Sequence, residues 1–186
     1  PDALILSKAG KRLTVRFRQA DLNRDLDFAL GEKPDLVTAS ALFDLCSAGF
    51  IQTFATAVTA RRAAFYTVLT YNGVQTWTPA HTDDTAFAAA FHAHQMTDKG
   101  FGASAGPKAP AALAAAFKAC GYAVGEGDSP WRLGASDQQL ITDLATGFAG
   151  AVRETGRVSL ATVETWLETR RTGAVVGHTD TLATPR

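Results

Sequence analysis

Residues 35–45 read DLVTASALFDL, and this stretch carries the clearest signal for the fold. Residues 35–39 are short, largely apolar and partly β-branched, which predicts a buried β-strand. The small residues Ser40 and Ala41 follow, where a ligand can approach the backbone, and Asp44 then stands among apolar neighbours. A strand that ends in a small-residue turn and a carboxylate favours an α/β protein, because ligands there lie beyond the carboxyl ends of the strands.

Strand and helix patterns alternate on both sides of this stretch. Before it, residues 13–19 alternate strictly between apolar and polar side chains, which predicts a half-buried strand, and a short helix with Leu26 and Leu30 follows. The remaining pattern predicts helices at 47–60, around Phe87 and Phe91, at 110–120, at 140–148 and after Ser159, and strands at 64–71, 122–126 and 174–182.

This alternation predicts one α/β domain over residues 1–186. Helices between successive strands imply crossover connections and therefore a mainly parallel sheet. The apolar character of residues 35–39 further predicts that helices cover both faces of the sheet, as in doubly wound folds.

Composition narrows the classes of function. The 186 residues include 18 basic and 18 acidic side chains, so no net charge favours binding to nucleic acid or to a membrane surface. Cys46 and Cys120 lie in apolar settings without CxxC spacing, which predicts reduced thiols in a cytoplasmic protein. No apolar run has the length of roughly 20 residues that spans a bilayer.

Four segments follow predicted strands and are expected to meet at one edge of the sheet: 20–22, 40–44, 71–73 and 128–131. Each offers small or polar groups where a ligand would lie. Asp21 and Asp44 have two interpretations of about equal weight, because a carboxylate after a strand either caps the next helix or contacts a ligand.

The sequence shows no known catalytic or metal-binding motif in the structural context that its chemistry requires. His92 and His94 leave a helix about 200° apart, so they do not share a metal ion, and neither HExxH nor a cysteine cluster is present; we expect no metal. His94 is either a packed, hydrogen-bonded side chain or a base. No GxSxG motif follows a predicted strand, where a serine nucleophile would need it, and no GxxxxGK[ST] motif occurs.

A glycine-rich stretch at 100–106 follows a helix and has one residue too many for GxGxxG, which excludes a dinucleotide-binding loop. It is either a flexible surface loop or a lid from which Lys99 reaches inward.

Six motifs in this order resemble the later part of a class I S-adenosylmethionine-dependent methyltransferase, similar to bacterial enzymes of undefined substrate. They are ADL (20–22), DLVTASALFDL (35–45), YTVLTYNG (66–73), HQMTDKGFG (94–102), SPWRLG (129–134) and VGHTDTLA (176–183). The resemblance runs from about Leu13 to Leu182. It implies a Rossmann-like sheet of seven strands, the last of them antiparallel and formed here by residues 174–182.

The resemblance also implies a role for each matching residue. Asp21 and Leu22 occupy the place that touches the adenine of S-adenosylmethionine. The turn of Ser40, Ala41 and Leu42 corresponds to the turn beside the methionine moiety and the transferable methyl group. The remaining candidates are the possible general bases Asp44 and His94, and the acceptor-pocket residues Tyr71, His94, Lys99 and Trp131. The acceptor is expected to be a small molecule.

This sequence departs from the family in one respect. The GxGxG turn after the first strand and the acidic residue after the second are absent. We therefore expect the 186 residues to be part of a longer polypeptide, and the strand at 35–39 to lose a neighbour and expose an apolar edge. The alternatives are a nucleotide-dependent oxidoreductase and a catalytically inert module with a methyltransferase-like fold.

Overall fold

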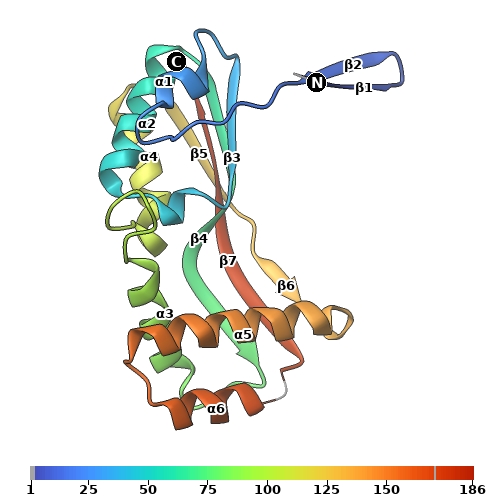
Figure 1. The fold of residues 1–186 in the computed structure, drawn as a ribbon, viewed down its shortest axis with the longest axis vertical. Coiled ribbons are helices and arrows are strands. Elements are labelled where there is room, and N and C mark those ends of the chain that lie inside the picture. The colour runs from blue at the N-terminus through green and yellow to red at the C-terminus, as the bar shows by residue number, and fades with distance from the viewer. Residues whose placement is uncertain (1–2, 170) are drawn as a thin grey trace.

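Helices and a mixed β-sheet make up the structure, a computed structural model that describes residues 3–169 and 171–186 (Figure 1). The strands are β1 (Leu4–Lys8), β2 (Lys11–Val15), β3 (Leu36–Ser40), β4 (Ala64–Thr78), β5 (Ala123–Asp128), β6 (Trp131–Leu133) and β7 (Gly173–Thr184). The α-helices are α1 (Leu26–Leu30), α2 (Ala48–Ala60), α3 (Asp84–Gln95), α4 (Ala109–Ala119), α5 (Gln138–Thr155) and α6 (Leu160–Glu168). Three 3-10 helices are η1 (Phe43–Leu45), η2 (Gly106–Lys108) and η3 (Ala135–Asp137). Within the described residues, every helix is too short or too polar to cross a membrane.

The main sheet has the strand order β3–β4–β7–β5, and β6 also pairs with β7. β3 and β4 are parallel, whereas β4, β5 and β6 each pair antiparallel with β7. The prediction of a mainly parallel sheet is therefore wrong, because most strands of the main sheet pair antiparallel with their neighbour. The last strand enters between β4 and β5 instead of adding at an edge, so each pairing that it makes is antiparallel. β3, β4, β5 and β6 still point in one direction, and β7 alone runs against them.

Residues 13–19 do not join this sheet, contrary to the sequence prediction. β2 pairs antiparallel with β1 in a separate hairpin, which projects away from the rest of the molecule in Figure 1. Ala9 and Gly10, both with positive φ, close the hairpin with a tight turn, so β2 finds its hydrogen bonds in the adjacent β1. Leu6 and Leu13 lie opposite each other there and both stay exposed.

Two apolar cores pack against the sheet. The first lies between α2, α4 and the β3 end of the sheet, where Phe65 stacks on Phe117 with 4.8 Å between ring centroids. The second lies between α3, α5 and α6, where Phe87 stacks on Trp166 at 4.2 Å. On β7, Ala183 belongs to the first core and Ala174 to the second. Side chains alternate along a strand, so the two cores use opposite faces of β7.

One face of the sheet is bare at the β3 end, which corrects the prediction that helices cover both faces. Leu36, Tyr66 and Leu182 are 52%, 39% and 46% exposed, while Phe65 and Ala183, which alternate with them, are fully buried. In Figure 1, α1, α2 and α4 all lie on one side of these strands. β3 is also an edge strand, as expected for a strand that lacks a neighbour. Its apolar character therefore comes from Val37 and Ala39, which contact the first core.

β4 is longer than the sequence predicted, because it continues through Asn72 and Gly73 to Thr78. The register with β7 shifts twice, after Thr67 and after Tyr71, so extra residues bulge out of β4 and the pairing resumes beyond them. Asp180 of β7 holds the first bulge, since its Oδ1 accepts the backbone N–H of Leu69 at 3.2 Å. The parallel β3–β4 pairing ends at the first bulge, where Ser40 lies opposite Val68.

Candidate functional site

The turn after β3 brings small residues to the carboxyl end of the parallel β3–β4 pair. Ala41 has a positive φ of 52° and donates its backbone N–H to the Val68 carbonyl of β4 at 3.1 Å. A residue with a Cβ in this backbone region costs about 1 kcal/mol, so the surrounding structure must hold the turn. Ser40 and Ala41 are exposed, and Leu42 packs on the first core. The backbone of the turn is thus open to a ligand.

Asp21 and Leu22 lie on the segment that joins β2 to α1. Asp21 Oδ1 accepts the backbone N–H of Asn23 at 3.0 Å, so the carboxylate holds a local turn, and Leu22 packs on the first core. Asn23 Nδ2 donates to the Gly100 carbonyl at 2.7 Å. The segment after Asp21 therefore contacts the glycine-rich loop.

Asp44 does not cap α2, so the interpretation of this carboxylate as a cap of the next helix is wrong. Ser47 is the N-cap, and its Oγ accepts the backbone N–H of Phe50 at 3.1 Å. The Asp44 side chain is only 8% exposed and its Oδ1 has no hydrogen-bond partner. Burial raises the pKa of this carboxyl, and a bond to its own backbone N–H opposes the shift. A buried carboxylate oxygen without a partner is costly and points to a ligand or a proton at this position.

Tyr71 is buried at the second bulge of β4. Burial raises the pKa of its hydroxyl, and the charge of Asp44 raises it further. Tyr71 Oη lies 2.9 Å from His92 Nε2 of α3. Burial lowers the pKa of His92, and a bond to the Gly73 backbone opposes that shift. Helical spacing does not identify His92 as a site residue, because it shows only that His92 faces away from His94.

His94 and Lys99 lie together at a different place. His94 Nε2 is 2.8 Å from Glu154 Oε2 of α5 and 3.4 Å from Lys99 Nζ. These residues line a hollow of about 350 Å³ with Thr97 and Arg157. His94 is thus packed and hydrogen-bonded, and its role as a base stays a prediction.

Trp131 packs beside His178, with 5.2 Å between ring centroids, and is partly exposed. His178 pairs with Tyr71 in the β4–β7 register, which puts Trp131 on the Tyr71 side of the sheet. The His178 ring is buried, which lowers its pKa, and its Nδ1 has no partner. We regard His178 as a second site residue that the sequence analysis missed.

Asn72 and residues 128–130 line one hollow of about 860 Å³ together with residues of β7, among them Val175 and Gly177. Segment 71–73 lies within β4, so the prediction that it follows a strand is wrong. The Asn72 side chain lies directly against Gly177, where an added Cβ would clash with Asn72 Oδ1. The size of this hollow suits a small molecule.

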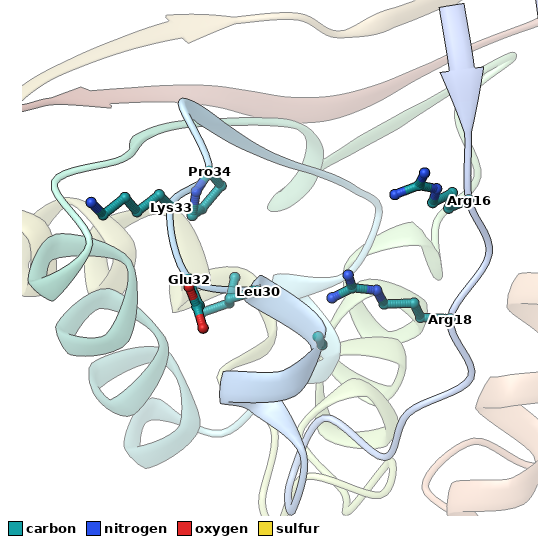
Figure 2. Close-up of a pocket in the computed structure, with 8 residues that line it drawn as sticks. Arg16, Arg18, Leu30, Glu32, Lys33 and Pro34 are labelled. Carbon is teal, nitrogen blue, oxygen red and sulfur yellow. The ribbon is translucent and has the colours of Figure 1, made fainter.

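A basic hollow of about 460 Å³ lies near the start of β3 and is lined by Arg16, Arg18, Glu32 and Lys33 (Figure 2). The side chains of Arg16 and Arg18 extend toward the end of α1, whereas Lys33 points the other way. Lys33 and Pro34 precede β3, so this hollow lies at the amino end of the strand. It is therefore separate from the site at the carboxyl ends.

The loop at 96–106 is anchored over η1. Ser104 Oγ donates to the Leu45 carbonyl at 2.8 Å, and Ala105 donates its backbone N–H to the Cys46 carbonyl at 2.7 Å. Asp98 Oδ1 accepts the N–H groups of Gly100 and Gly102. The loop is thus tied to the segment that carries Asp44 and is not a free surface loop, and its role as a lid stays a prediction.

Cys46 and Cys120 are free thiols. Burial, with the nearby Asp44 charge, raises the pKa of Cys46 to about 12, so this thiol stays protonated at neutral pH. Three or more His, Cys, Asp or Glu side chains do not gather as a metal site anywhere in the described residues.

Comparison of the sequence with protein families and with curated proteins gives no match in either case. The function therefore has to be argued from the residues and the fold.

Proposed function

We propose that this protein is a class I S-adenosylmethionine-dependent methyltransferase that acts on a small-molecule acceptor. The observation that carries the proposal is the direction of the strands. β3, β4, β5 and β6 run the same way, and the final strand β7 alone runs against them. An antiparallel final strand is what the resemblance to this family implies, and β7 contains the VGHTDTLA motif.

The turn after β3 fits the methionine part of S-adenosylmethionine. Ser40 and Ala41 are small and exposed, and Leu42 offers an apolar surface beside them. Asp21 fits less well, because its carboxylate is engaged by the Asn23 N–H. Leu22 and the backbone of this segment are then the groups that would contact the adenine.

S-adenosylmethionine supplies a methyl group on a positively charged sulfur, and the transfer is an in-line displacement. The residues of this chain have to align the acceptor, exclude water and accept a proton. Asp44 is suited to the last role because its carboxyl is buried and its pKa is raised. Tyr71 and Trp131 lie where they would wall the acceptor.

Calorimetry on the native protein with S-adenosylmethionine, S-adenosylhomocysteine and NAD tests the proposal. We expect binding of the first two and none of NAD. The variant Ala41→Trp, which fills the open turn, should weaken binding about tenfold or more, and Leu140→Trp on the exposed side of α5 serves as the matched control. Binding of NAD alone would instead favour an oxidoreductase, and binding of none of the three would favour an inert module.

A further inference from the structure

The hollow of about 860 Å³ beside β7, here called the β7 hollow, opens on one face of the sheet. Val175 and Gly177 line it, whereas Ala174, the residue before Val175, belongs to the second core. Side chains alternate along a strand, so the hollow lies on the face opposite the second core. The hollow also includes Asn72, which follows the parallel β3–β4 pairing, and Asp128, which ends β5. It therefore lies beyond the carboxyl ends of these strands, where α/β proteins bind ligands.

Apolar side chains form part of the β7 hollow. Val74 is 50% exposed although it lies within β4, and Pro130 and Val175 also line the hollow. The amide of Asn72 is already used, because its Oδ1 accepts the backbone N–H of Val74 at 3.1 Å and its Nδ2 donates to Thr179 Oγ1 at 3.3 Å. Asn72 thus shapes the hollow, and an apolar part of a ligand would cover Val74.

Two side chains of opposite charge line the β7 hollow at separate places. Asp128 pairs with Thr179 of β7 in the strand register. Arg132 of β6 pairs with Val175. These partners are four residues apart, which is about 13 Å along the strand, and an even spacing puts both side chains on the same face. Within the part of the chain that the structure describes, the ion pairs involve neither side chain, so both charges are free for a ligand.

A ligand that satisfies both charges carries one charge of each sign. The guanidinium of Arg132 binds a carboxylate through two parallel N–H groups, and the carboxylate of Asp128 accepts N–H groups from an ammonium. Asp128 would repel a phosphate or a dicarboxylate, and Arg132 would repel a diamine. The charges of the ligand also have to be far apart. An α-amino acid holds them only about 3 Å from each other and reaches one of the two side chains at a time.

We propose that the β7 hollow binds an elongated zwitterion, with its carboxylate on Arg132, its ammonium on Asp128 and an apolar chain over Val74. An ω-amino acid of about six carbons is such a molecule, because its charges lie roughly 7–8 Å apart and contacts of about 3 Å at each end bring the span close to 13 Å. Binding does not depend on the proposed function. The identification of this zwitterion as the methyl acceptor does rest on it.

Ligand-observed NMR on the native protein measures this preference. The probes are 6-aminohexanoate, its singly charged counterparts hexanoate and hexylamine, and the shorter zwitterions 4-aminobutyrate and glycine. We expect 6-aminohexanoate to bind about fivefold more tightly than either singly charged probe, a modest factor because each ion pair is partly exposed to solvent. Affinity should fall at 4-aminobutyrate and again at glycine, since their charges are too close together to meet both side chains.

Each charged side chain is tested by removing its own charge. Arg132→Gln should abolish the preference for 6-aminohexanoate over hexylamine, and Asp128→Asn should abolish the preference over hexanoate. Arg132→Gln should still bind hexylamine, and Asp128→Asn should still bind hexanoate, which also shows that each variant is folded. Glu126→Gln and Arg153→Gln change exposed charges outside the hollow, and as matched controls they should alter neither preference.

A further variant locates the site. Thr76 lines the hollow, so Thr76→Trp should weaken binding of 6-aminohexanoate about tenfold or more, whereas Leu182→Trp on the bare face at the β3 end should leave it unchanged. Equal affinity for the zwitterion and the singly charged probes would overturn the inference, and so would preferences that survive both Arg132→Gln and Asp128→Asn. A failure of the proposed function would appear separately, as binding of 6-aminohexanoate without binding of S-adenosylmethionine.

Discussion

His92 and His94 stand two residues apart on α3 and have opposite surroundings. His92 meets the buried hydroxyl of Tyr71, and burial lowers its pKa. His94 meets Glu154, whose side chain is 71% exposed, and the nearby Lys99. The helix turns about 100° per residue, so two residues are enough to move a side chain from the sheet side of α3 to the α5 side. The chemistry of each histidine is therefore set by the element that packs opposite it.

The largest effect is expected from removing the partner of His92. Tyr71→Ala should lower the free energy of unfolding by about 3 kcal/mol, because it empties a buried site beside Phe91 and leaves His92 without its partner. Urea unfolding measures this. Tyr66→Ala, on the bare face of the sheet, is the control and should cost less than about 1 kcal/mol. Equal costs would show that Tyr71 is not packed as described.

The next largest change in the free energy of unfolding is expected at the two histidines themselves. His92→Phe should cost about 1–2 kcal/mol, because the Tyr71 hydroxyl is left buried without an acceptor. His94→Phe should change stability by less than about 0.5 kcal/mol, since its partner is exposed to solvent. Both variants are measured by chemical denaturation at pH 7. A larger cost at His94 would reverse the comparison.

Asp44→Asn should stabilise the protein by about 1 kcal/mol at pH 7, because a buried and unpaired charge is removed. The folded-state pKa of Asp44 is raised above 3.8. The stability that the protonated carboxyl preserves is therefore fully present below that pH, and it is lost as the pH rises through the raised pKa and the buried group becomes charged. The advantage of the variant should therefore shrink on acidification toward pH 4. An advantage that is constant with pH would mean that Asp44 does not titrate in this range.

The smallest effect is expected at the exposed partner of His94. Glu154→Gln should change the unfolding free energy by no more than about 0.5 kcal/mol, and 1 M salt should remove most of the difference. Thermal melts with and without salt measure it. A salt-insensitive loss above 1 kcal/mol would place this pair in a more buried setting than the structure gives it.

Local periodicity predicted most of the helices and strands. α2, α4 and β3 lie within a residue or two of their expected bounds, because apolar spacing and terminal residues such as Ser47 and Gly121 are local signals. β1, β6 and the second half of β4 were missed. β6 has only three residues, and β4 continues past Asn72 and Gly73 because bulges absorb the extra residues. Neither feature has a strong local signal.

The candidate site was predicted only in part. Asp44 lies shortly after β3, as expected for a residue that follows a strand, but Tyr71 lies within β4 and Trp131 begins β6. His94 and Lys99 gather on the side of α3 that faces α5. His92 and His178 were missed, because their partners are Tyr71 and Trp131. Those partners lie 21 and 47 positions away along the chain.

Local sequence patterns specify the α/β class, the position of the small-residue turn after β3 and the final strand at 174–182. These features depend on residues within a few positions of one another, whose spacing sets backbone geometry and the side that is buried. Long-range packing decides that β7 enters between β4 and β5, that one sheet face is bare and that Asp44 Oδ1 is buried without a partner. Strand pairing, burial and pKa depend on which distant segments meet, and no local pattern encodes that choice.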